Sequence, residues 1–576
     1  MSKRKKQYAP RTETKTVESP APGKKKKHPG LQRLGAALPY LLTFLLAWIF
    51  CTAIYGDVFT RAQQDSYVSA NAETMKYLTD QAYGQLYWWG RYLLLVYKSA
   101  LLGGLLLALL LTAATYCLDR FLCLPRWLRG ISAIPAFALL WWMVSRGYSL
   151  FYKNEPSVIV LYPLALALIA AAAAGLTALV KRFARKGAAD KAATPADLAQ
   201  TAPTPLWKRL PYGCLVPAAC FAALTAYTLS HNENEILTAR MQNRVLTGEA
   251  DEIALLVDDG LSARQPSRSV AAYYAVGLMQ TGQLLEHIFD IPYKYPEMPL
   301  DEKDGSEEYG IFETDCNFFV GLTNASYRAG MDHIVMNGPR LYQLKRMALC
   351  ALVNHENQLA EKYLKLISEM PFEQSFVERY RPMLADSTLI DADPVLSQVR
   401  KLRPEEQRFE QNYRRPIFMG YNIGLLSGSN EAIDASIAAC LYSKDLNNAY
   451  MRIAVLPTLK RPLPSCTQEA LVILGLKQPA VFEQYPDLSP QAAGRPGSAY
   501  ATVQSFIADI QKFYQEKYGN AADWQEKMKA DLKGGIPEDV RDYLATDWMG
   551  HYVYYYYCEN IKTKDNGENK NKSGVN

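Results

Sequence analysis

Two aspartates that follow the first apolar stretch are the residues best placed to do chemistry. Asp57 and Asp65 come soon after an uncharged run that ends at Tyr55, so their carboxylates would lie near a membrane surface. A carboxylate in that position can act as a general base on a substrate that approaches from the bilayer. Aspartates are also common in ordinary loops, so a structural role is the alternative interpretation.

The sequence lacks the motifs of the common cofactor and metal enzymes. It contains no Walker loop, no GxGxxG after a strand, no GxSxG and no HExxH. His355 and Glu356 are adjacent, but no second histidine follows at the spacing that places two ligands on one helix face. The chain has six histidines, and they are scattered. We therefore expect no cofactor and no metal site.

Ser387 and Thr388 are candidate sites of modification. Together with Asp386 they resemble the three-residue acceptor motif for periplasmic O-glycosylation in Bacteroidota. Three residues recur by chance, so an unmodified loop is the alternative.

These residues belong to a chain whose front is apolar and whose back is polar. About 20 apolar residues are needed to cross roughly 30 Å of hydrocarbon. The segments predicted to span are 34–55, 99–118, 130–145, 158–180 and 212–229. The third is the weakest, because it has only about sixteen uncharged residues and Pro135 interrupts it; a re-entrant segment is the alternative. The first is predicted to stay uncleaved, since both its basic flank and its apolar run are too long for a signal peptide.

Charge predicts the orientation of these spans, because Lys and Arg are enriched in cytoplasmic loops. With the N-terminus inside, the cytoplasmic stretches 1–33, 119–129 and 181–211 hold eleven, three and seven Lys and Arg. The outer loops 56–91 and 146–156 hold three and two. Five crossings would then place the polar half of the chain outside the cytoplasm, which in a bacterium is the periplasm.

The basic character of the chain is local. The net charge is +6, yet residues 1–33 alone hold eleven basic and two acidic residues, so the remainder is slightly acidic. This distribution argues against nucleic acid as a partner. Ten cysteines are scattered without a CxxC pair, so we expect mostly buried free thiols rather than a disulfide framework or a zinc site.

From residue 231 onward, apolar residues recur at three- and four-residue spacing, which predicts paired helices. Helical hairpins are expected over 235–257, 269–289, 339–371 and 432–456. The run HYVYYYY at 551–557 is interpreted as a buried final helix or strand, with an aromatic ligand surface as the alternative.

The clearest of these units, 339–371, resembles a tetratricopeptide repeat. Its two helices are lined on one face by Leu344, Met347, Ala348 and Ala351 and by Ala360, Leu364 and Ile367. The early aromatic and the glycine of the repeat are Leu344 and Ala348 here, and the spacing between units is irregular. The resemblance implies an α-solenoid of degenerate helical hairpins with a concave binding face.

The layout of the whole chain resembles an uncharacterised family of Bacteroidota inner-membrane proteins. In that family a multi-span half, with a Gln- and aromatic-rich segment before its second span, precedes a tetratricopeptide-like half. The likeness rests on Asp80, Gln81, Gln85, Leu86 and Tyr87 and on the run NQLAEKYLKL at 357–366. The family has no established activity, so the resemblance implies an architecture and a location.

The sequence thus predicts an all-α protein with an N-terminal bundle of about five transmembrane helices and a C-terminal α-solenoid. Its predicted parts are a disordered basic tail at 1–33, transmembrane helices within 34–180, a cytoplasmic linker at 181–211, a last transmembrane helix at 212–230, a periplasmic helical-repeat domain at 231–561 and a disordered tail at 562–576. The expected function is an inner-membrane scaffold, embedded in the lipid bilayer, that binds protein partners in envelope assembly or transport. The alternative is a membrane enzyme that acts on a lipid-linked sugar with Asp57 or Asp65 as base, because multi-span transferases of that class keep a catalytic carboxylate in a similar place.

Overall fold

The computed structural model describes residues 29–125, 128–152, 154–188, 212–296, 306–404, 430–519 and 521–559. All regular secondary structure in these ranges is helical, and none of their residues belongs to a strand. The all-α prediction is therefore confirmed for the described part of the chain. The predicted disordered tail 562–576, and most of the predicted tail 1–33 and linker 181–211, lie outside the described residues.

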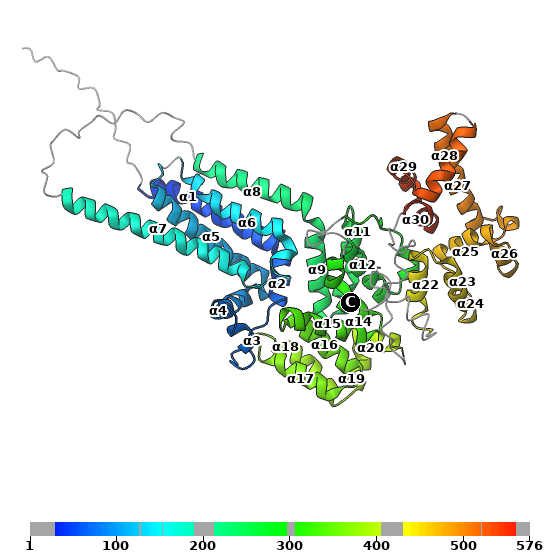
Figure 1. Cartoon of the computed structure of the whole chain (residues 1–576), viewed down its shortest axis with the longest axis horizontal. Coiled ribbons are helices and arrows are strands. Elements are labelled where there is room, and N and C mark those ends of the chain that lie inside the picture. The colour runs from blue at the N-terminus through cyan, green and yellow to red at the C-terminus, as the bar shows by residue number, and fades with distance from the viewer. Residues whose placement is uncertain are drawn as a thin grey trace, which may run out of the picture.

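Five helices lie side by side at one end of the molecule (Figure 1). They are α1 (Pro29–Ile49), α5 (Ala100–Leu122), α6 (Ile134–Arg146), α7 (Val158–Ala188) and α8 (Tyr212–His231). α1 continues into the π-helical turn η1 (Phe50–Ile54), and α5 lies between α1 and α7 and contacts both. We call this group the bundle.

Four helical segments of the described ranges are long and apolar enough to cross a membrane. They are Ala37–Ile54, Ala100–Leu122, Val158–Phe183 and Gly213–His231. They coincide with the first, second, fourth and fifth predicted spans. Large apolar side chains such as Leu168, Ile169 and Val180 are exposed along them, which suits contact with lipid rather than water.

The third predicted span has a different structure. It consists of a 3-10 turn, η3 (Arg129–Ala133), followed by the 13-residue helix α6. Pro135 does not interrupt this segment, contrary to the prediction, because it is the second residue of α6. Proline in the first turn removes no intrahelical hydrogen bond, and its fixed φ suits the start of a helix. α6 contacts α5, α7 and α8.

Two bundle helices extend beyond the predicted boundaries. α1 begins at Pro29, inside the predicted tail 1–33, and α7 continues to Ala188, inside the predicted linker 181–211. Backbone hydrogen bonds do not stop where the apolar residues stop, so a helix can continue beyond its apolar segment.

The segment between the first two spans, expected as an outer loop, is mostly helical. It contains α2 (Gly56–Gln64), α3 (Lys76–Thr79), α4 (Gly84–Leu94) and the 3-10 turn η2 (Leu95–Lys98). α2 packs on the first helix of the polar half, and Tyr67, Val68, Met75 and Leu78 are buried in the same core as that half. The segment after α6, which begins with η4 (Gly147–Leu150), lies at the same end of the bundle.

The first helical body of the polar half surrounds one hydrophobic core. Its helices pack mainly against their neighbours in sequence, and α12 and α16 also contact α14. They are α9 (Glu233–Thr247), α10 (Ala250–Ala254), α11 (Leu256–Ser262), α12 (Arg268–Thr281), α14 (Ser306–Phe319), α15 (Thr323–Asn337), α16 (Leu341–Val353), α17 (Asn357–Ser368), α18 (Gln374–Tyr380), η7 (Arg381–Leu384), α19 (Thr388–Ala392) and α20 (Pro394–Leu402). The short helix α13 (Leu284–His287) follows α12, but its buried residues Leu284 and Leu285 lie in the core of the second body.

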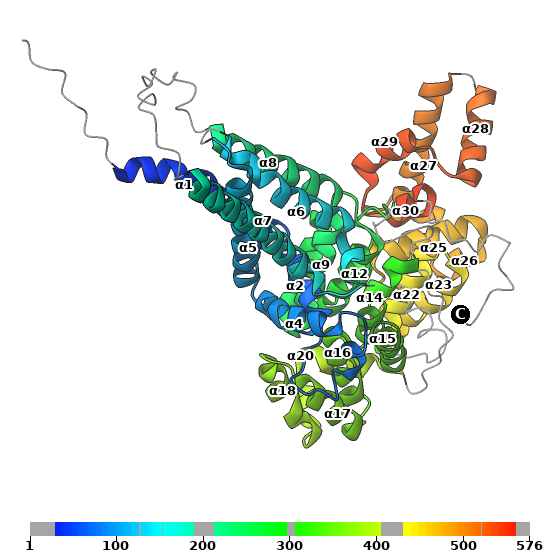
Figure 2. The same ribbon diagram turned by 60° about the vertical axis from the view of Figure 1, so that its left-hand side comes forward.

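The second helical body lies beside the first (Figures 1 and 2). It has a core of its own and joins the first through α12 and α13. Val270 and Tyr273 of α12 belong to the first core, whereas Tyr274 and Leu278 belong to the second, so α12 is buried on two faces. The helices of the second body are α22 (Ile433–Tyr442), α23 (Leu446–Ile453), α24 (Val455–Thr458), α25 (Ser465–Lys477), α26 (Ala480–Gln484), η8 (Pro486–Leu488), η9 (Pro490–Ala492), α27 (Ala499–Tyr518), α28 (Ala521–Gly534), α29 (Glu538–Trp548) and α30 (Tyr552–Cys558).

The four predicted hairpins are each found as helices joined by short turns. Gly248 and Gly282 end α9 and α12 with φ of +68° and +72°, values that glycine adopts without strain. The tyrosine run forms the buried helix α30, so the helical interpretation is confirmed and the strand is not. All ten cysteines are free, but only six are buried and Cys123 is exposed.

Candidate functional site

Asp57 lies in the first turn of α2 and is paired with the polar half. Its Oδ2 accepts a hydrogen bond from Arg240 Nε at 3.0 Å, and its main-chain oxygen accepts one from Asn243. Both members of the ion pair are about 40% exposed. Asp57 therefore holds α2 against α9 at the edge of a larger contact, which we call the junction. In it, α2, η4 and residues 151, 152 and 154 lie against α9, α14, α16 and Arg340, which precedes α16.

Asp65 is enclosed at the end of α2. Its Oδ1 lies 3.0 Å from Arg61 Nη1, and neither side chain is more than 3% exposed. Arg61 also donates from Nε to Gln242 Oε1 at 2.7 Å and lies over the Tyr342 ring, 3.8 Å from its centroid. Each of the two candidate aspartates thus has its own arginine, and the described contacts do not bring them together.

Gln242 continues this network from α9 into the core of the first body. Its Oε1 also accepts from Tyr148 in η4 at 2.9 Å, and its Nε2 donates to Tyr273 Oη at 3.1 Å. Tyr273 donates to Asp315 Oδ2 at 2.8 Å, and the other oxygen of Asp315 lies 2.6 Å from Arg346 Nη2. A chain of hydrogen bonds therefore runs from Arg61, in the last turn of α2, to a buried ion pair between α14 and α16.

Glu235 is a buried carboxylate just after the last span. It accepts from Asn232 Nδ2 at 2.7 Å, from Tyr55 Oη at 3.2 Å and from the main-chain nitrogen of Tyr148 at 3.3 Å. Burial raises its pKa to about 7, although the three hydrogen bonds favour the charged form. Gly147 has φ of +49°, and a Cβ there would lie 1.9 Å from Glu235 Oε1, so only glycine allows this close approach.

Arg340 connects both membrane-linked segments to the first body. Its Nη1 donates to the carbonyl oxygens of Asp65 at 2.8 Å and Phe151 at 3.2 Å, and its Nη2 donates to those of Tyr152 and Asn154. Burial lowers the pKa of Arg340, and the four carbonyl groups supply the hydrogen bonds that a buried guanidinium needs. One side chain therefore fixes the segments before α5 and before α7 to the same site.

A second set of polar contacts ties η2 and the loop that holds Ser69 to the first body. Glu373 accepts from Lys98 and from Lys345, both at 2.8 Å, and its side chain is 2% exposed. Ser69 donates to Glu369 at 3.0 Å. Many polar groups of the two halves therefore bond to one another, although buried atoms such as Arg61 Nη2, Asp65 Oδ2 and Arg340 Nε have no hydrogen-bond partner. The number of bonds across this contact suits mechanical attachment.

The repeat residues predicted from the sequence lie in the core of the first body. Leu344, Met347, Ala348 and Ala351 of α16, and Ala360, Leu364 and Ile367 of α17, are at most 2% exposed. α16 and α17 pack against each other along their length, and His355 in the turn between them has φ of +62°. Ala348 and Ala360 have small side chains, which allow the two helices to lie close together.

Ser387 and Thr388 lie in an exposed turn between η7 and α19. Asp386 Oδ1 accepts from the main-chain nitrogen of Thr388 at 2.9 Å and from its hydroxyl at 2.6 Å. The Thr388 hydroxyl is thus engaged as a local turn contact, whereas Ser387 is exposed at the tip.

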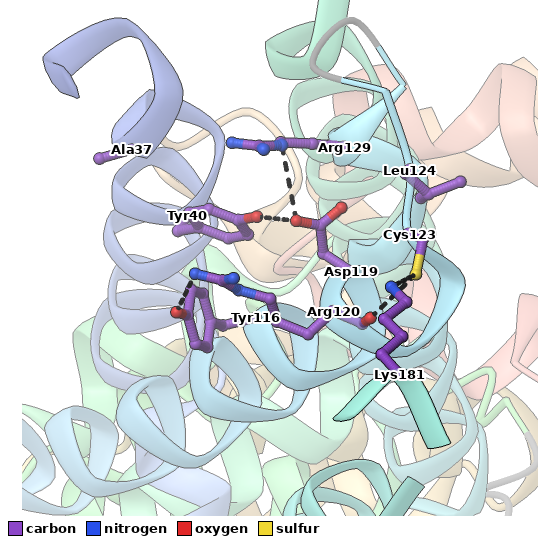
Figure 3. A pocket seen from close by; sticks show the side chains of 9 residues that line it. All are labelled: Ala37, Tyr40, Tyr116, Asp119, Arg120, Cys123, Leu124, Arg129 and Lys181. Carbon is purple, nitrogen blue, oxygen red and sulfur yellow. Dashed lines mark hydrogen bonds and ion pairs between the residues drawn. The ribbon is translucent and has the colours of Figure 1, made fainter. Parts of the chain in front are cut away.

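Sequence reasoning missed a pocket at the opposite end of the bundle (Figure 3). We call it the far pocket; its volume is about 480 Å³, and it is lined by Ala37, Tyr40, Tyr116, Asp119, Arg120, Cys123, Leu124, Arg129 and Lys181. The second span was predicted to end at Leu118, so Asp119 was taken for a flanking residue, but α5 continues to Leu122. An ionisable residue within an apolar helix is the signal that could have identified the site.

Among the described residues, Asp57 and Asp65 included, no three His, Cys, Asp or Glu side chains are grouped so that they could hold a metal ion. Fold and sites together define an all-helical protein in which candidate membrane spans are bonded directly to a polar helical half. The chain belongs to a family of unknown function, DUF6057, which matches residues 32–154 and 148–559. This fits the uncharacterised family that the sequence resembles. No curated protein and no solved structure matches the chain.

Proposed function

We propose that this chain is a five-span protein of a bacterial inner membrane that holds a helical-repeat domain in the periplasm as a scaffold for protein partners in envelope assembly or transport. The observation that carries the proposal is the junction. A domain meant to move freely would be joined by a linker, whereas here Arg340, Arg61 and Gln242 bind it to the membrane-linked segments through buried groups. Such an attachment presents a surface at a fixed height and angle above the bilayer.

The path of the chain supports five crossings. η2 lies at the junction end of α5, and residues 151–154, just before α7, contact Arg340 there. Lys181 of α7 meets Cys123 at the other end. The chain must therefore return between Cys123 and Gly147, and only η3 and α6 can carry it. Five residues at about 2.0 Å and thirteen at about 1.5 Å give roughly 30 Å, the thickness of a hydrocarbon core.

Charge supports the orientation. The end of the bundle away from the junction is the end flanked by the basic stretches 1–33, 119–129 and 181–211. Lys and Arg are retained on the cytoplasmic side, so the polar half faces the periplasm. The Bacteroidota origin rests on the resemblance alone, and so does the tetratricopeptide-like character of the helical hairpins.

The packing of α14 to α17 supports a repeat scaffold, since each helix contacts the next. α15 also leaves apolar side chains uncovered: Met331, Val335 and Met336 are 41%, 73% and 81% exposed. Three neighbouring apolar residues on one helix favour a binding surface, whereas a single exposed apolar residue is ordinary. A lipid-linked sugar enzyme is the less favoured alternative, because a base must reach its substrate and Asp65 is enclosed by Arg61 and the helices around it.

Topology is tested first, with reporter fusions after Asn232 and after Asn576 that are active only in the periplasm or only in the cytoplasm. We expect periplasmic activity at both positions. Cytoplasmic activity at both would contradict five crossings and turn the helical half into a cytosolic platform.

The scaffold role is tested by photo-crosslinking in cells with the crosslinking residue at position 336. We expect a discrete protein adduct that is lost when Val335 is replaced by Glu. Position 451 is the matched control, because Met451 is 68% exposed but stands alone on α23. An adduct with lipid only at position 336 would assign α15 to the membrane surface and contradict the scaffold surface proposed here.

A further inference from the structure

The far pocket gathers cations at the level where apolar helices end. Arg120 comes from α5, Arg129 from η3 and Lys181 from α7 (Figure 3). The apolar segments of α5 and α7 end at Leu122 and Phe183, so all three cations lie at the headgroup level of a bilayer that the bundle crosses. Asp119 is the one carboxylate of the lining, so the lining has an excess of two positive charges.

Asp119 organises one wall of this pocket. Its side chain is 5% exposed, its Oδ2 accepts from the Tyr40 hydroxyl, and the same oxygen lies 3.5 Å from Arg129 Nε. A buried carboxylate needs such partners. Asp119 holds Tyr40 and Arg129 in place, and the other two cations of the lining, Arg120 and Lys181, border the far pocket.

Arg120 and Lys181 contact neutral groups in the described structure. Arg120 Nη2 donates to Tyr116 Oη at 2.7 Å, and Lys181 Nζ donates to Cys123 Sγ at 2.6 Å. A tyrosine hydroxyl and a thiol carry no formal charge, so they are weaker acceptors for a cation than a phosphate oxygen, whose negative charge adds a Coulomb attraction. An anion in the pocket would therefore exchange two weak contacts for two strong ones.

The surface around the pocket suits the apolar part of the same ligand. Leu109 of α5 and Leu176, Leu179 and Val180 of α7 are 50–67% exposed. They precede Arg120 and Lys181 on their helices and so lie on the bilayer side of the pocket, where acyl chains would lie.

We propose that the far pocket binds the phosphate of an anionic glycerophospholipid, with Arg120 and Lys181 as its ligands and the acyl chains along α5 and α7. The inference requires only that the bundle spans a membrane. It is independent of the scaffold role and of which side the pocket faces.

The test uses the full-length protein in nanodiscs of phosphatidylcholine with a minor fraction of phosphatidylglycerol. Lipids retained after transfer to detergent are counted by native mass spectrometry. We expect preferential retention of phosphatidylglycerol, reduced about tenfold in the double variant Arg120→Gln with Lys181→Gln, as loss of two charge-assisted contacts predicts. The control is Arg146→Gln with Lys76→Gln, which removes the same charge from exposed positions at the junction end and should retain the lipid.

A second variant preserves every charge. Ala37 lines the pocket, so Ala37→Trp should fill it and also abolish the preference, with an unchanged melting temperature as the sign of a folded protein. Equal retention of phosphatidylglycerol by wild type and by both pocket variants would overturn the proposal. Displacement by millimolar inorganic phosphate without any preference among lipids would also overturn it, because the site would then serve free phosphate.

Discussion

The two helical bodies bury their polar groups in different ways. The first body encloses ion pairs, such as Asp315 with Arg346 and Glu373 with Lys345, and these connect to the bundle. The second body encloses tyrosines: Tyr555 packs on Phe289 with ring centroids 4.7 Å apart and donates to the carbonyl oxygen of Tyr442 at 2.6 Å. The first body thus encloses charged pairs that also fix its position on the membrane segments, whereas the second is built mainly by aromatic packing, beside the contact of the buried Glu469 with His551.

The strongest test of this difference between the two bodies is to remove one partner of a buried ion pair in the first body. Asp315→Ala leaves Arg346 charged and buried, and it also removes the acceptor of Tyr273. We expect a loss of about 3–5 kcal/mol in the free energy of unfolding, measured by thermal or denaturant unfolding in detergent. Asp487→Ala is the matched control: its pair with Arg495 is mostly exposed, so the loss should be below about 1 kcal/mol. Equal losses would contradict the directional role of the first core.

The next largest effect is a pH dependence at the junction. The pKa of Glu235 is about 7 in the folded chain, against an ordinary value near 4.3. Between these pH values the folded chain keeps a proton that the unfolded chain has lost, so stability falls as pH rises through this window. Glu235→Gln should remove this pH dependence, which amounts to about 4 kcal/mol in the free energy of unfolding, measured as the unfolding midpoint between pH 4.5 and 8.

Glu313 provides the comparison for that experiment. Its pKa is also raised to about 7, by burial first and by Asp332 second, so it contributes a slope of the same sign. Glu313→Gln should remove the pH dependence of stability that Glu313 causes and leave the pH dependence that Glu235 causes. If Glu235→Gln changes nothing, the carboxylate is hydrated and the junction is more open than its contacts indicate.

In the second body a single hydroxyl should have a small effect. Tyr555→Phe keeps the ring packing and removes the bond to Tyr442, so we expect a loss of about 1 kcal/mol. Tyr543→Phe, at a tyrosine that is 41% exposed, should change the unfolding midpoint less. A loss as large as that of Asp315→Ala would show that the two bodies do not differ in kind.

The smallest effect is expected at Asp57. Its pair with Arg240 is about 40% exposed, so Asp57→Asn should cost less than about 1 kcal/mol and leave cell function intact at normal protein levels. Complementation of a deletion strain measures this. Loss of function with normal protein levels would favour the enzyme alternative.

Local pattern was enough to predict most of the helices. The predicted hairpins at 235–257 and 269–289 are found as helices that turn at Gly248 and Gly282, because apolar spacing and a following glycine are local signals. Four of the apolar spans follow from length and composition in the same way.

The junction could not be predicted, because its partners are distant in the sequence. Gln242 is 181 residues from Arg61, and Arg340 is 275 from Asp65. No periodicity relates such positions. Part of the far pocket could have been predicted, because Asp119 and Arg120 are charged residues at the end of an apolar helix. That Lys181 and Arg129 lie next to them in the fold could not be predicted from the sequence.

α12 has a consequence for how the polar half can be divided. Because Tyr273 faces one core and Tyr274 the other, a fragment that stops after Leu402 would leave a stripe of α12 bare, including Ala271, Ala275 and Leu278. Such a fragment would self-associate, and its melting would describe an aggregate rather than a domain. The polar half is therefore best expressed and unfolded as one cooperative unit, with any cut made outside the range shared by both cores.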